Sequence, residues 1–243
     1  MRPPHLGTEE AQSVSEVQVS RGAWAYERGR LWVMELDGDG YPPALIQPDI
    51  AANFSEVTRE PASTLAAAME LPGLETIQQR FAAGRRCFAA WVQEEIATYC
   101  WFSQTPECIG EMEREIKIPA DEAYIWDCAT VPAFRRKNLY NALLGRLALH
   151  LKAEGLRRVW IGSSLENHPS QRAFMSAGFR PVVTALYARL YNLSCMAIFG
   201  TSDAPKELVD LARQRLARRH ERSWGPILLS FSGPVYLPAC VQM

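Results

Sequence analysis

The stretch from Val131 to Tyr140 carries the residues whose types and spacing point most directly to chemistry. Three consecutive cations, Arg135, Arg136 and Lys137, follow an apolar strand pattern and stand directly before a helix pattern. The first turn of a helix presents unpaired backbone N–H groups and the positive end of the helix dipole. With the cations added, this arrangement favours a ligand with a diphosphate group, although three cations alone are also typical of an exposed basic turn.

A strand and an amphipathic helix must position these cations. Residues 123–131 read as a buried strand that ends before Pro132, and residues 136–154 carry apolar side chains at helical spacing up to Gly155. Residues 86–93 and 96–102 read as two strands separated by a short turn, which predicts a hairpin. Strands that alternate with helices beside a hairpin predict an α/β (or α+β) fold with a mixed sheet flanked by helices.

The rest of the chain predicts further elements around this centre. Expected strands cover residues 30–36, 54–58, 113–118, 158–162 and 180–199, the last as a hairpin around Asn192. Expected helices cover residues 63–69 with Ser63 as N-cap, 74–83, 169–177 and 205–219. We expect a loose arm over residues 1–20, one domain over residues 21–200, and a C-terminal helix with an apolar strand or tail over residues 201–243 that packs on it.

Length and composition exclude several classes of protein. The chain has 243 residues, of which 48% are apolar, enough for one large core, and its net charge of −1 argues against a general nucleic-acid binder. No apolar run approaches the length of a membrane span and no signal peptide is apparent, so we expect a cytoplasmic protein without a membrane partner. The six cysteines form no CxxC pair and no zinc-site spacing, so we expect reduced thiols and no metal.

From about residue 85 to residue 180 the chain resembles the GNAT superfamily of acyl-CoA-dependent N-acetyltransferases. The hairpin of residues 86–102 resembles two strands of that family, and AYIWDCATVPAFRRKNLYNALL resembles its cofactor motif, whose signature is Q/R-x-x-G-x-G/A. The segment ENHPSQRAFMSAGF resembles a later motif, with Asn167, Phe174, Gly178 and Phe179 at the family's spacing. The order and separation of the three motifs carry the resemblance, which does not extend to either end of the chain.

The resemblance implies a GNAT-like central mixed sheet in which two splayed strands hold acetyl-CoA as co-substrate. The pantetheine arm would pair with strand backbone, and the diphosphate would rest on the N–H groups at the helix start. The implied cofactor-binding residues are Cys128, Ala129, Thr130, Val131, Arg135, Arg136, Lys137, Asn138, Leu139, Tyr140, Asn167 at the pantetheine arm and Phe174 at the thiol end.

Three positions depart from the family pattern. Asn138 and Tyr140 stand where the signature has small residues; asparagine tolerates unusual backbone angles, whereas Tyr140 would enter the phosphate cradle or point along the apolar stripe of its helix, which we favour. Phe174 stands where many members have a tyrosine that can protonate the departing thiolate. Either the thiolate leaves unassisted, or another group donates the proton; the candidates are Tyr140, Ser163, Ser164 and His168.

The implied reaction is direct attack of an amine on the thioester in a ternary complex, which needs a base. Asp127 is the first candidate for the base, because it interrupts an apolar strand, where an unpaired charge is costly. The alternative is that Asp127 points to the opposite face and pairs with an arginine or lysine. Glu122 and His168 are the other candidates, each with a structural role as the alternative. A strand N–H in the region of residues 128–130 would stabilise the oxyanion, and Trp101 and Trp126 could line an acceptor pocket.

We therefore expect an acyl-CoA-dependent N-acetyltransferase whose acceptor is a small-molecule amine or a protein amino group. One alternative is a non-catalytic member of the fold that binds acyl-CoA or a partner. Another is a transferase that acts on a hydroxyl or uses a different CoA thioester. The apolar tail would suit a subunit contact in a homodimer or a cover over the sheet, and the sequence leaves the acceptor open.

Overall fold

The structure is a computed structural model that describes residues 24–37, 43–58, 62–191, 193–217 and 222–231. The expected arm over residues 1–20, the turn residue Asn192 and the last twelve residues of the tail lie outside this described part. Its strands are β1 (Trp24–Glu35), β2 (Asn53–Val57), β3 (Arg86–Val92), β4 (Glu95–Ser103), β5 (Glu107–Ile109), β6 (Arg114–Ile116), β7 (Glu122–Thr130), β8 (Arg158–Ser164), β9 (Arg180–Leu190), β10 (Leu193–Gly200), β11 (Arg222–Trp224) and β12 (Ile227–Phe231).

Five α-helices are present in the described part of the chain, together with two short 3₁₀ turns. They are α1 (Ala62–Ala68), α2 (Glu75–Ala82), α3 (Leu139–Ala153), α4 (His168–Ala177) and α5 (Lys206–Leu216). Gly84 and Gly178 follow the ends of α2 and α4 with φ of 76° and 103°, left-handed angles that glycine adopts without a steric penalty. None of the described helices is long and apolar enough to cross a membrane.

Ten strands form one mixed sheet in the order β11-β12-β10-β9-β1-β8-β7-β4-β3-β2, which confirms the predicted fold class. Neighbouring strands are antiparallel except β7 and β8, which run parallel. The parallel pairing extends only from the pair Glu122–Arg158 to the pair Ile125–Ile161. Because β7 continues to Thr130 and β8 to Ser164, the two strands separate beyond that point and leave an opening inside the sheet.

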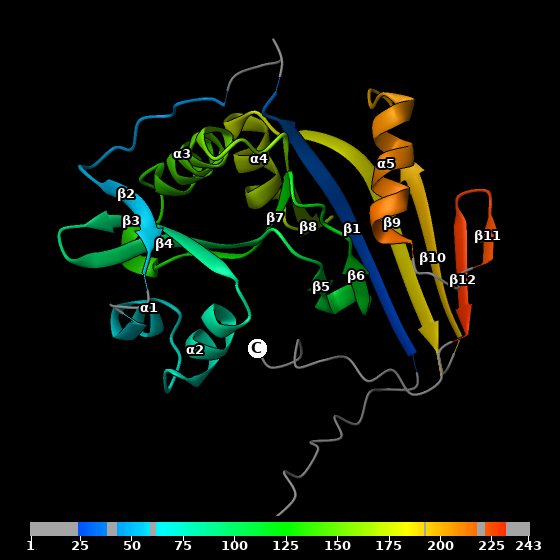
Figure 1. Ribbon diagram of the computed structural model, residues 1–243, viewed down its shortest axis with the longest axis horizontal. Coiled ribbons are helices and arrows are strands. Elements are labelled where there is room, and N and C mark those ends of the chain that lie inside the picture. Colours follow the sequence, from blue (N-terminus) through cyan, green and yellow to red (C-terminus); the bar gives the residue numbers. More distant parts are fainter. Residues whose placement is uncertain (1–23, 38–42, 59–61, 192, 218–221, 232–243) are drawn as a thin grey trace, which may run out of the picture.

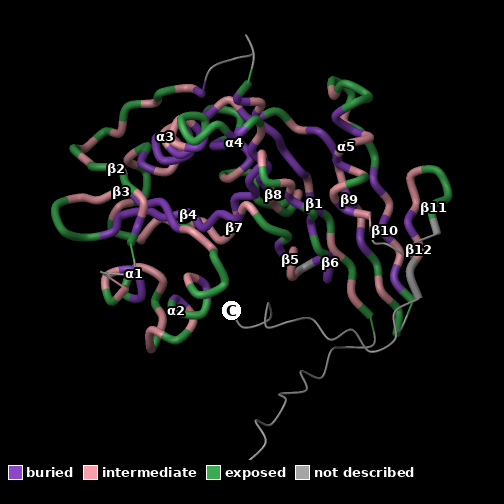
Figure 2. The backbone as a smooth tube through the Cα atoms, in the orientation of Figure 1, coloured by how far each residue is buried: buried purple, intermediate pink, exposed green. Residues whose placement is uncertain are grey.

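Helices cover the sheet on both faces, as Figure 1 shows. Trp32, Phe102 and Ile125 point to the face on which α3 and α4 pack. Trp101, next to Phe102, points to the opposite face, because successive side chains of a strand alternate between faces. That second face is covered by α1 and α2 over β3 and β4, and by α5 with the β5–β6 hairpin over β1, β9 and β10. The buried segments in Figure 2 follow the central strands and α3.

The position of β1 is the main feature that the sequence did not reveal. This strand lies between β8 and β9 and is antiparallel to both, although more than 120 residues separate it from β8 along the chain. Pairing over such a separation depends on the whole fold and leaves no local signal in the sequence. The strand also begins at Trp24, six residues earlier than predicted.

Three predicted boundaries are corrected. The strand expected at residues 113–118 is the short β6, which pairs with β5 in a separate two-stranded sheet. The first helix begins at Ala62, so Ser63 lies inside it and is not its N-cap. The helix expected from residue 136 begins at Leu139, because Arg136 and Asn138 have φ of 60° and 55°, which is incompatible with a right-handed helix.

Gly145 of α3 lies against the backbone of the loop before β2. A Cβ atom at this position would lie 2.3 Å from the carbonyl oxygen of Ala44, a backbone atom that cannot rotate away. We expect Gly145→Ala to lower the free energy of unfolding by about 1–3 kcal/mol, the usual cost of overpacking. Chemical denaturation measures this change. Gly155→Ala is a comparison for backbone strain alone, because nothing lies within 4 Å of the added atom but the φ of 86° is one that a residue with a side chain rarely adopts.

Candidate active site

The opening between β7 and β8 exposes a strand edge in the middle of the sheet. On the β4 side, Cys100 pairs with Cys128 and Trp101 pairs with Trp126, so Asp127 is an extra residue in β7. Its φ of 40° and the register shift define a β-bulge. Beyond Ile125 the β8 side of β7 has no strand partner in the described chain, and an extended ligand with amide groups could pair with it.

The turn before α3 presents backbone N–H groups in the manner of an anion cradle. Among the described residues, the N–H groups of residues 136–140 donate to no backbone carbonyl. Arg136 and Asn138 have left-handed φ angles, which are typical of the nests of successive N–H groups that bind anions. The Asn138 side chain donates to Asp49 at 3.0 and 3.2 Å, and the Asp49 N–H donates to the Lys137 carbonyl at 3.0 Å, so the preceding loop fixes this turn.

The three cations of this turn differ in their contacts. Arg135 donates from Nε to the Thr130 carbonyl at 3.2 Å, which ties the turn to the end of β7. The ammonium of Lys137 lies 5.4 Å from the ring centre of Phe134, whereas Arg136 is exposed. The Leu139 side chain is buried in the core, so only its backbone could meet a ligand.

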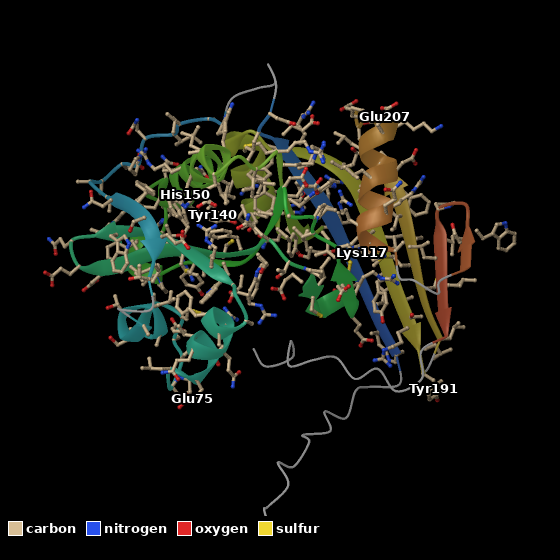
Figure 3. All side chains as sticks on the ribbon, viewed as in Figure 1. Glu75, Lys117, Tyr140, His150, Tyr191 and Glu207 are labelled. Carbon is tan, nitrogen blue, oxygen red and sulfur yellow. The ribbon has the colours of Figure 1, made fainter. Side chains whose placement is uncertain are left out.

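Tyr140 points into the protein, toward the core and not into the turn before α3. Its ring packs edge-on against Phe174 at 6.5 Å, and Figure 3 labels it on α3. Burial, followed by the neighbouring Cys128 and Cys100 thiols, raises the pKa of Tyr140 well above its usual value of 10. The orientation that we favoured from the sequence is therefore the one observed. Tyr140 is therefore part of the core between α3 and the sheet.

Asn167 and His168 stand at the start of α4. The Asn167 side chain accepts a hydrogen bond from the Ser170 N–H at 3.2 Å and so caps the helix. His168 is an exposed first residue of the helix and does not line the cavity described below. Phe174 on the same helix is 2% exposed and packs against Trp32 and Tyr140.

A cavity of about 570 Å³ lies against the strand opening. The wall nearest the bulge is formed by residues from both separated strands, namely Tyr124, Trp126, Asp127, Gly162, Ser163 and Ser164. Helix α2, the β5–β6 region and β1 supply the rest of the wall. Of the three predicted bases, only Asp127 lines this cavity, and of the two predicted pocket tryptophans only Trp126 does.

Asp127 is held in an ion pair with Arg80 of α2, so the alternative contact considered from the sequence is also present. Arg80 is 5% exposed, and its guanidinium lies 4.9 Å from the ring of Trp101 and 4.7 Å from that of Trp126. This stacking fixes Arg80, and Arg80 in turn fixes the carboxylate at the rim of the opening. The helical pattern of α2 does not indicate that Arg80 pairs with a residue of β7.

Glu107 forms a second acidic centre in the cavity wall, and the sequence did not reveal it. Arg85 donates to its two oxygens at 2.8 and 2.7 Å, and Ser103 donates to it at 2.9 Å. The indole N–H of Trp126 donates to Ser103 at 3.2 Å. The network connects Trp126 to β5 and keeps its ring oriented at the cavity wall.

The carboxylate of Glu122 is surrounded by hydrogen-bond donors, as is typical of a residue with a structural role. It is fully buried, and its carboxylate accepts hydrogen bonds from Arg158 at 2.7 Å, Trp160 at 2.6 Å and Arg215 at 3.0 and 3.2 Å. Burial alone would raise its pKa, but hydrogen bonds from Arg215, Trp160 and Arg158 outweigh burial and lower it below its usual value. Glu122 does not line the cavity.

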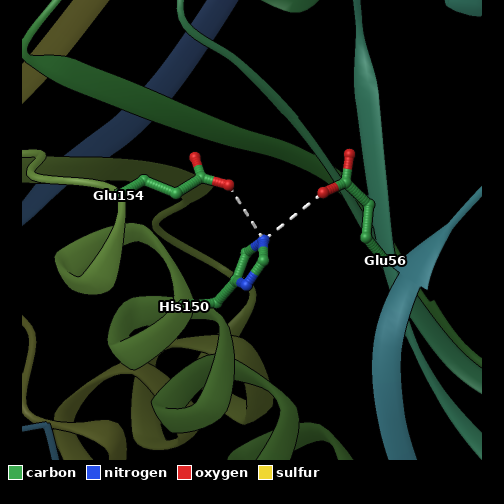
Figure 4. Close-up of side chains that lie close together, drawn as sticks. All are labelled: Glu56, His150 and Glu154. Atoms are coloured by element: carbon green, nitrogen blue, oxygen red, sulfur yellow. Dashed lines mark hydrogen bonds and ion pairs between the residues drawn. The ribbon is translucent and has the colours of Figure 1, made fainter.

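Glu56, His150 and Glu154 lie close together at the other end of α3, as Figure 4 shows. The His150 Nε2 atom is 3.3 Å from Glu56 and 3.2 Å from Glu154. These residue types could ligate a metal, but Arg86 already donates to both carboxylates, and hydrogen bonds to them raise its pKa. The guanidinium of Arg86 thus supplies the positive charge between these carboxylates, and the cluster joins β2, β3 and α3.

Comparisons with known proteins agree with this geometry. The model of the acetyltransferase (GNAT) family matches residues 54–179, more than half of the chain. No curated protein matches the chain. Among solved structures, a GNAT-family acetyltransferase from Novosphingobium aromaticivorans is 12% identical, with a TM-score of 0.46; the similarity covers 74% of this chain and 69% of that one.

Two further solved structures are similar at the same low level. A GCN5-related N-acetyltransferase from Sphaerobacter thermophilus is 11% identical with a TM-score of 0.49, and 74% of this chain and 55% of that chain are covered. The ribosomal-protein-S18-alanine N-acetyltransferase from Escherichia coli is 16% identical with a TM-score of 0.43, and the covered shares are 54% and 78%. The match to the family model, which spans the splayed strands and the turn before α3, carries the assignment: this chain belongs to the GNAT acetyltransferase family.

Proposed function

We propose that this protein transfers an acetyl group from acetyl-CoA to an amine by direct attack within a ternary complex. The observation that carries the proposal is the separation of β7 from β8 beyond Ile125, directly beside a turn with free N–H groups. A thioester carrier with two amides and a diphosphate matches an open strand edge that ends at an anion cradle. Residues that match the family motif stand at both places.

Acetyl-CoA would enter from the side of α3 and α4. Its diphosphate would meet the N–H groups of residues 136–140, and Arg136 would add charge there. Its pantetheine arm would follow the β8 side of residues 128–131, with Asn167 within reach at the start of α4. The resemblance implies that the thiol end would lie near Phe174, which packs against Trp32 and Tyr140.

The acceptor amine would occupy the cavity on the α2 side. Asp127 lines that cavity at the bulge, so it can take the amine's proton directly or through a water molecule while Arg80 keeps the carboxylate in place. A backbone N–H near residue 128, beside the bulge, would stabilise the oxyanion. Phe174 has no proton to give, and a thiolate whose conjugate thiol has a pKa of about 8.5 leaves readily without one.

The second candidate, a non-catalytic member of the fold, is favoured by one observation. Tyr140 stands where the family signature has a small residue, and its ring packs against Phe174, which lacks the hydroxyl that many members have. In such a protein CoA would bind but no acyl transfer would follow.

Calorimetry with CoA and acetyl-CoA, followed by thiol release with a panel of amines, separates the two candidates. The proposed enzyme binds acetyl-CoA and releases thiol at a steady rate with at least one amine. Binding without thiol release for any amine or alcohol would support the non-catalytic protein. Steady release with alcohols alone would mean transfer to a hydroxyl. No affinity for any CoA derivative would contradict the proposal altogether.

Arg136→Glu tests the cradle directly. A negative charge at the helix start would repel the diphosphate, so we expect the rise in melting temperature caused by CoA to disappear, with at least a tenfold loss of affinity. Arg136 is exposed and makes no described side-chain contact, so the apo melting temperature is expected to stay unchanged. Lys152→Glu, at the far end of the same helix, is the matched control. An intact CoA-induced shift in Arg136→Glu would place the diphosphate elsewhere.

A further inference from the structure

One half of the sheet has a face that no layer of the described chain covers. The core beneath α3 and α4 includes no described residue of β9, β10 or β12, and α5, beside these strands in Figure 1, packs on their other face. Tyr187 and Met196, which point toward α5, are fully buried. Their neighbours Ala188 and Cys195 point the other way, and they are exposed and half-buried respectively.

The strand register gathers large apolar side chains on this uncovered side. Trp24 of β1 pairs with Leu190 of β9, and Leu190 pairs with Leu193 of β10. At the other edge of the sheet, Trp224 of β11 pairs with Ile227 of β12. Residues that pair directly in a sheet share a face, so these side chains belong to one surface. We call it the open face and define it by its six large exposed residues, Trp24, Tyr26, Leu190, Leu193, Phe199 and Trp224.

The open face is large enough for a stable interface. Its six defining residues are between 41% and 79% exposed. With about 150–250 Å² for each aromatic side chain, its four aromatic residues alone leave on the order of 400–600 Å² accessible to water. The largest apolar patch of a typical monomer is about 300–600 Å², and a standard interface buries about 800 Å² on each partner. The two leucines bring the open face toward the second value, so a partner that covers it is favoured.

The charges around the open face favour a second copy of the same chain as its partner. None of the six defining residues is charged at neutral pH, and Glu27 and Arg189, which adjoin them in sequence, alternate to the α5 side. Arg28, at the border, is already paired with Glu166. A charged partner would therefore find no counter-charge on the open face, whereas two neutral copies do not repel each other.

The shape of the open face also complements itself. Trp24 and Trp224 lie on its outermost strands, β1 and β11, and the strands between them carry the small residues Ala188, Cys195 and Ala197. In a two-fold arrangement the large side chains of one copy can lie over the small residues of the other. Two sheets pack face to face in this way at a separation of about 10 Å.

We propose that this protein is a homodimer in which the open faces of two copies pack against each other, sheet on sheet, about a two-fold axis. The dimer buries the six defining residues of each copy. The cavity lies on the α2 side of the sheet, so both copies keep it accessible. The inference does not depend on the proposed function, and it places the subunit contact on the strands and not on the apolar tail.

Sedimentation equilibrium of the full-length protein at a series of concentrations tests the dimer. We expect twice the mass of one chain, with dissociation on dilution. Leu190→Asp would bury one unpaired charge per copy, so the dissociation constant of the dimer is expected to rise by about 100-fold or more. Leu45→Asp is the matched control, since this leucine is 54% exposed against 57% for Leu190 and lies in the loop before β2, outside the open face. Its dissociation constant is expected to equal that of the unsubstituted protein.

Trp224→Ala is the second variant, for the case that circular dichroism shows Leu190→Asp to be poorly folded. Trp224 is among the most exposed residues of the described chain and contributes little to the folding of a single copy. Its removal is expected to raise the dissociation constant by about tenfold or more, as for a tryptophan that is important in an interface.

Two results would overturn the dimer. The first is the mass of a single chain at every concentration; if that monomer binds lipid vesicles and Leu190→Asp does not, the open face meets a membrane instead. The second is a dimer whose dissociation constant is unchanged in both Leu190→Asp and Trp224→Ala, because the two copies would then meet through another surface. CoA affinity is measured in parallel, and its absence would contradict the proposed function without affecting the dimer.

Discussion

Asp127→Asn is expected to lower kcat by about 100- to 10,000-fold, the contribution usual for a positioned base. Asparagine has the same shape, and its amide oxygen can still accept a hydrogen bond from Arg80, so the bulge and the cavity wall should persist. What is lost is a group that can take a proton from the ammonium form of the acceptor and so release the neutral amine that attacks. The measurement is the pH profile of kcat/KM for the best amine, together with the affinity for CoA by calorimetry.

The control is Asp121→Asn, which changes an exposed carboxylate just before β7 that is paired with Arg157 and lies outside the cavity. CoA affinity is expected to be unchanged in both variants. Two outcomes for Asp127→Asn have different meanings. One is full turnover at neutral pH, and the other is turnover that returns only when the pH is raised until the amine is deprotonated in solution. Full turnover at neutral pH refutes the role of Asp127, whereas recovery only at high pH supports it.

Glu122→Gln is expected to cause the largest loss of stability, about 3–5 kcal/mol, which is typical when one member of a buried ion pair is removed. Arg158 and Arg215 would keep their charges in the core beside Trp160, with a neutral amide in place of the carboxylate. For a chain of this length the melting temperature should fall by on the order of 10 °C. Glu115→Gln, on the exposed side of β6, should change it very little.

The same carboxylate should make stability depend on pH in the acid range. Since the pKa of Glu122 is lower in the folded protein than in the unfolded chain, its contribution is complete above the unfolded value of about 4.3. The contribution is lost as the pH falls through the folded value. The difference in unfolding free energy between the unsubstituted protein and Glu122→Gln should therefore shrink below about pH 4. A difference that stays constant down to pH 3 would show that Glu122 is not ionised in the core.

A substantial part of the fold was predictable from local patterns. The hairpin of β3 and β4, the strand β7 and the helices α3 and α4 each have a period and a terminal residue that identify them, such as Gly178 after α4. The opening between β7 and β8 was implied by the resemblance to the GNAT superfamily and not by any local pattern. The helix start before α3 is local, because it depends on the residues of one strand, one turn and one helix.

The tertiary structure alone decided the partners of the charged residues. Asp127 and Glu122 lie five residues apart on one strand and look alike in sequence, yet Asp127 faces the cavity beside Arg80 while Glu122 is enclosed by Arg158 and Arg215. The bulge at Asp127 breaks the alternation on which any sequence-based assignment of faces depends.

The position of β1 shows the same limit. The strand and helix patterns of the sequence, which arise from neighbouring residues, predicted a mixed sheet flanked by helices, and the resemblance to the GNAT superfamily implied a cofactor site at the turn before α3. It could not place the N-terminal strand between β8 and β9, and so could not bring Arg30 next to Ser163. Such contacts between distant segments are selected by the packing of the whole sheet, which no local spacing records.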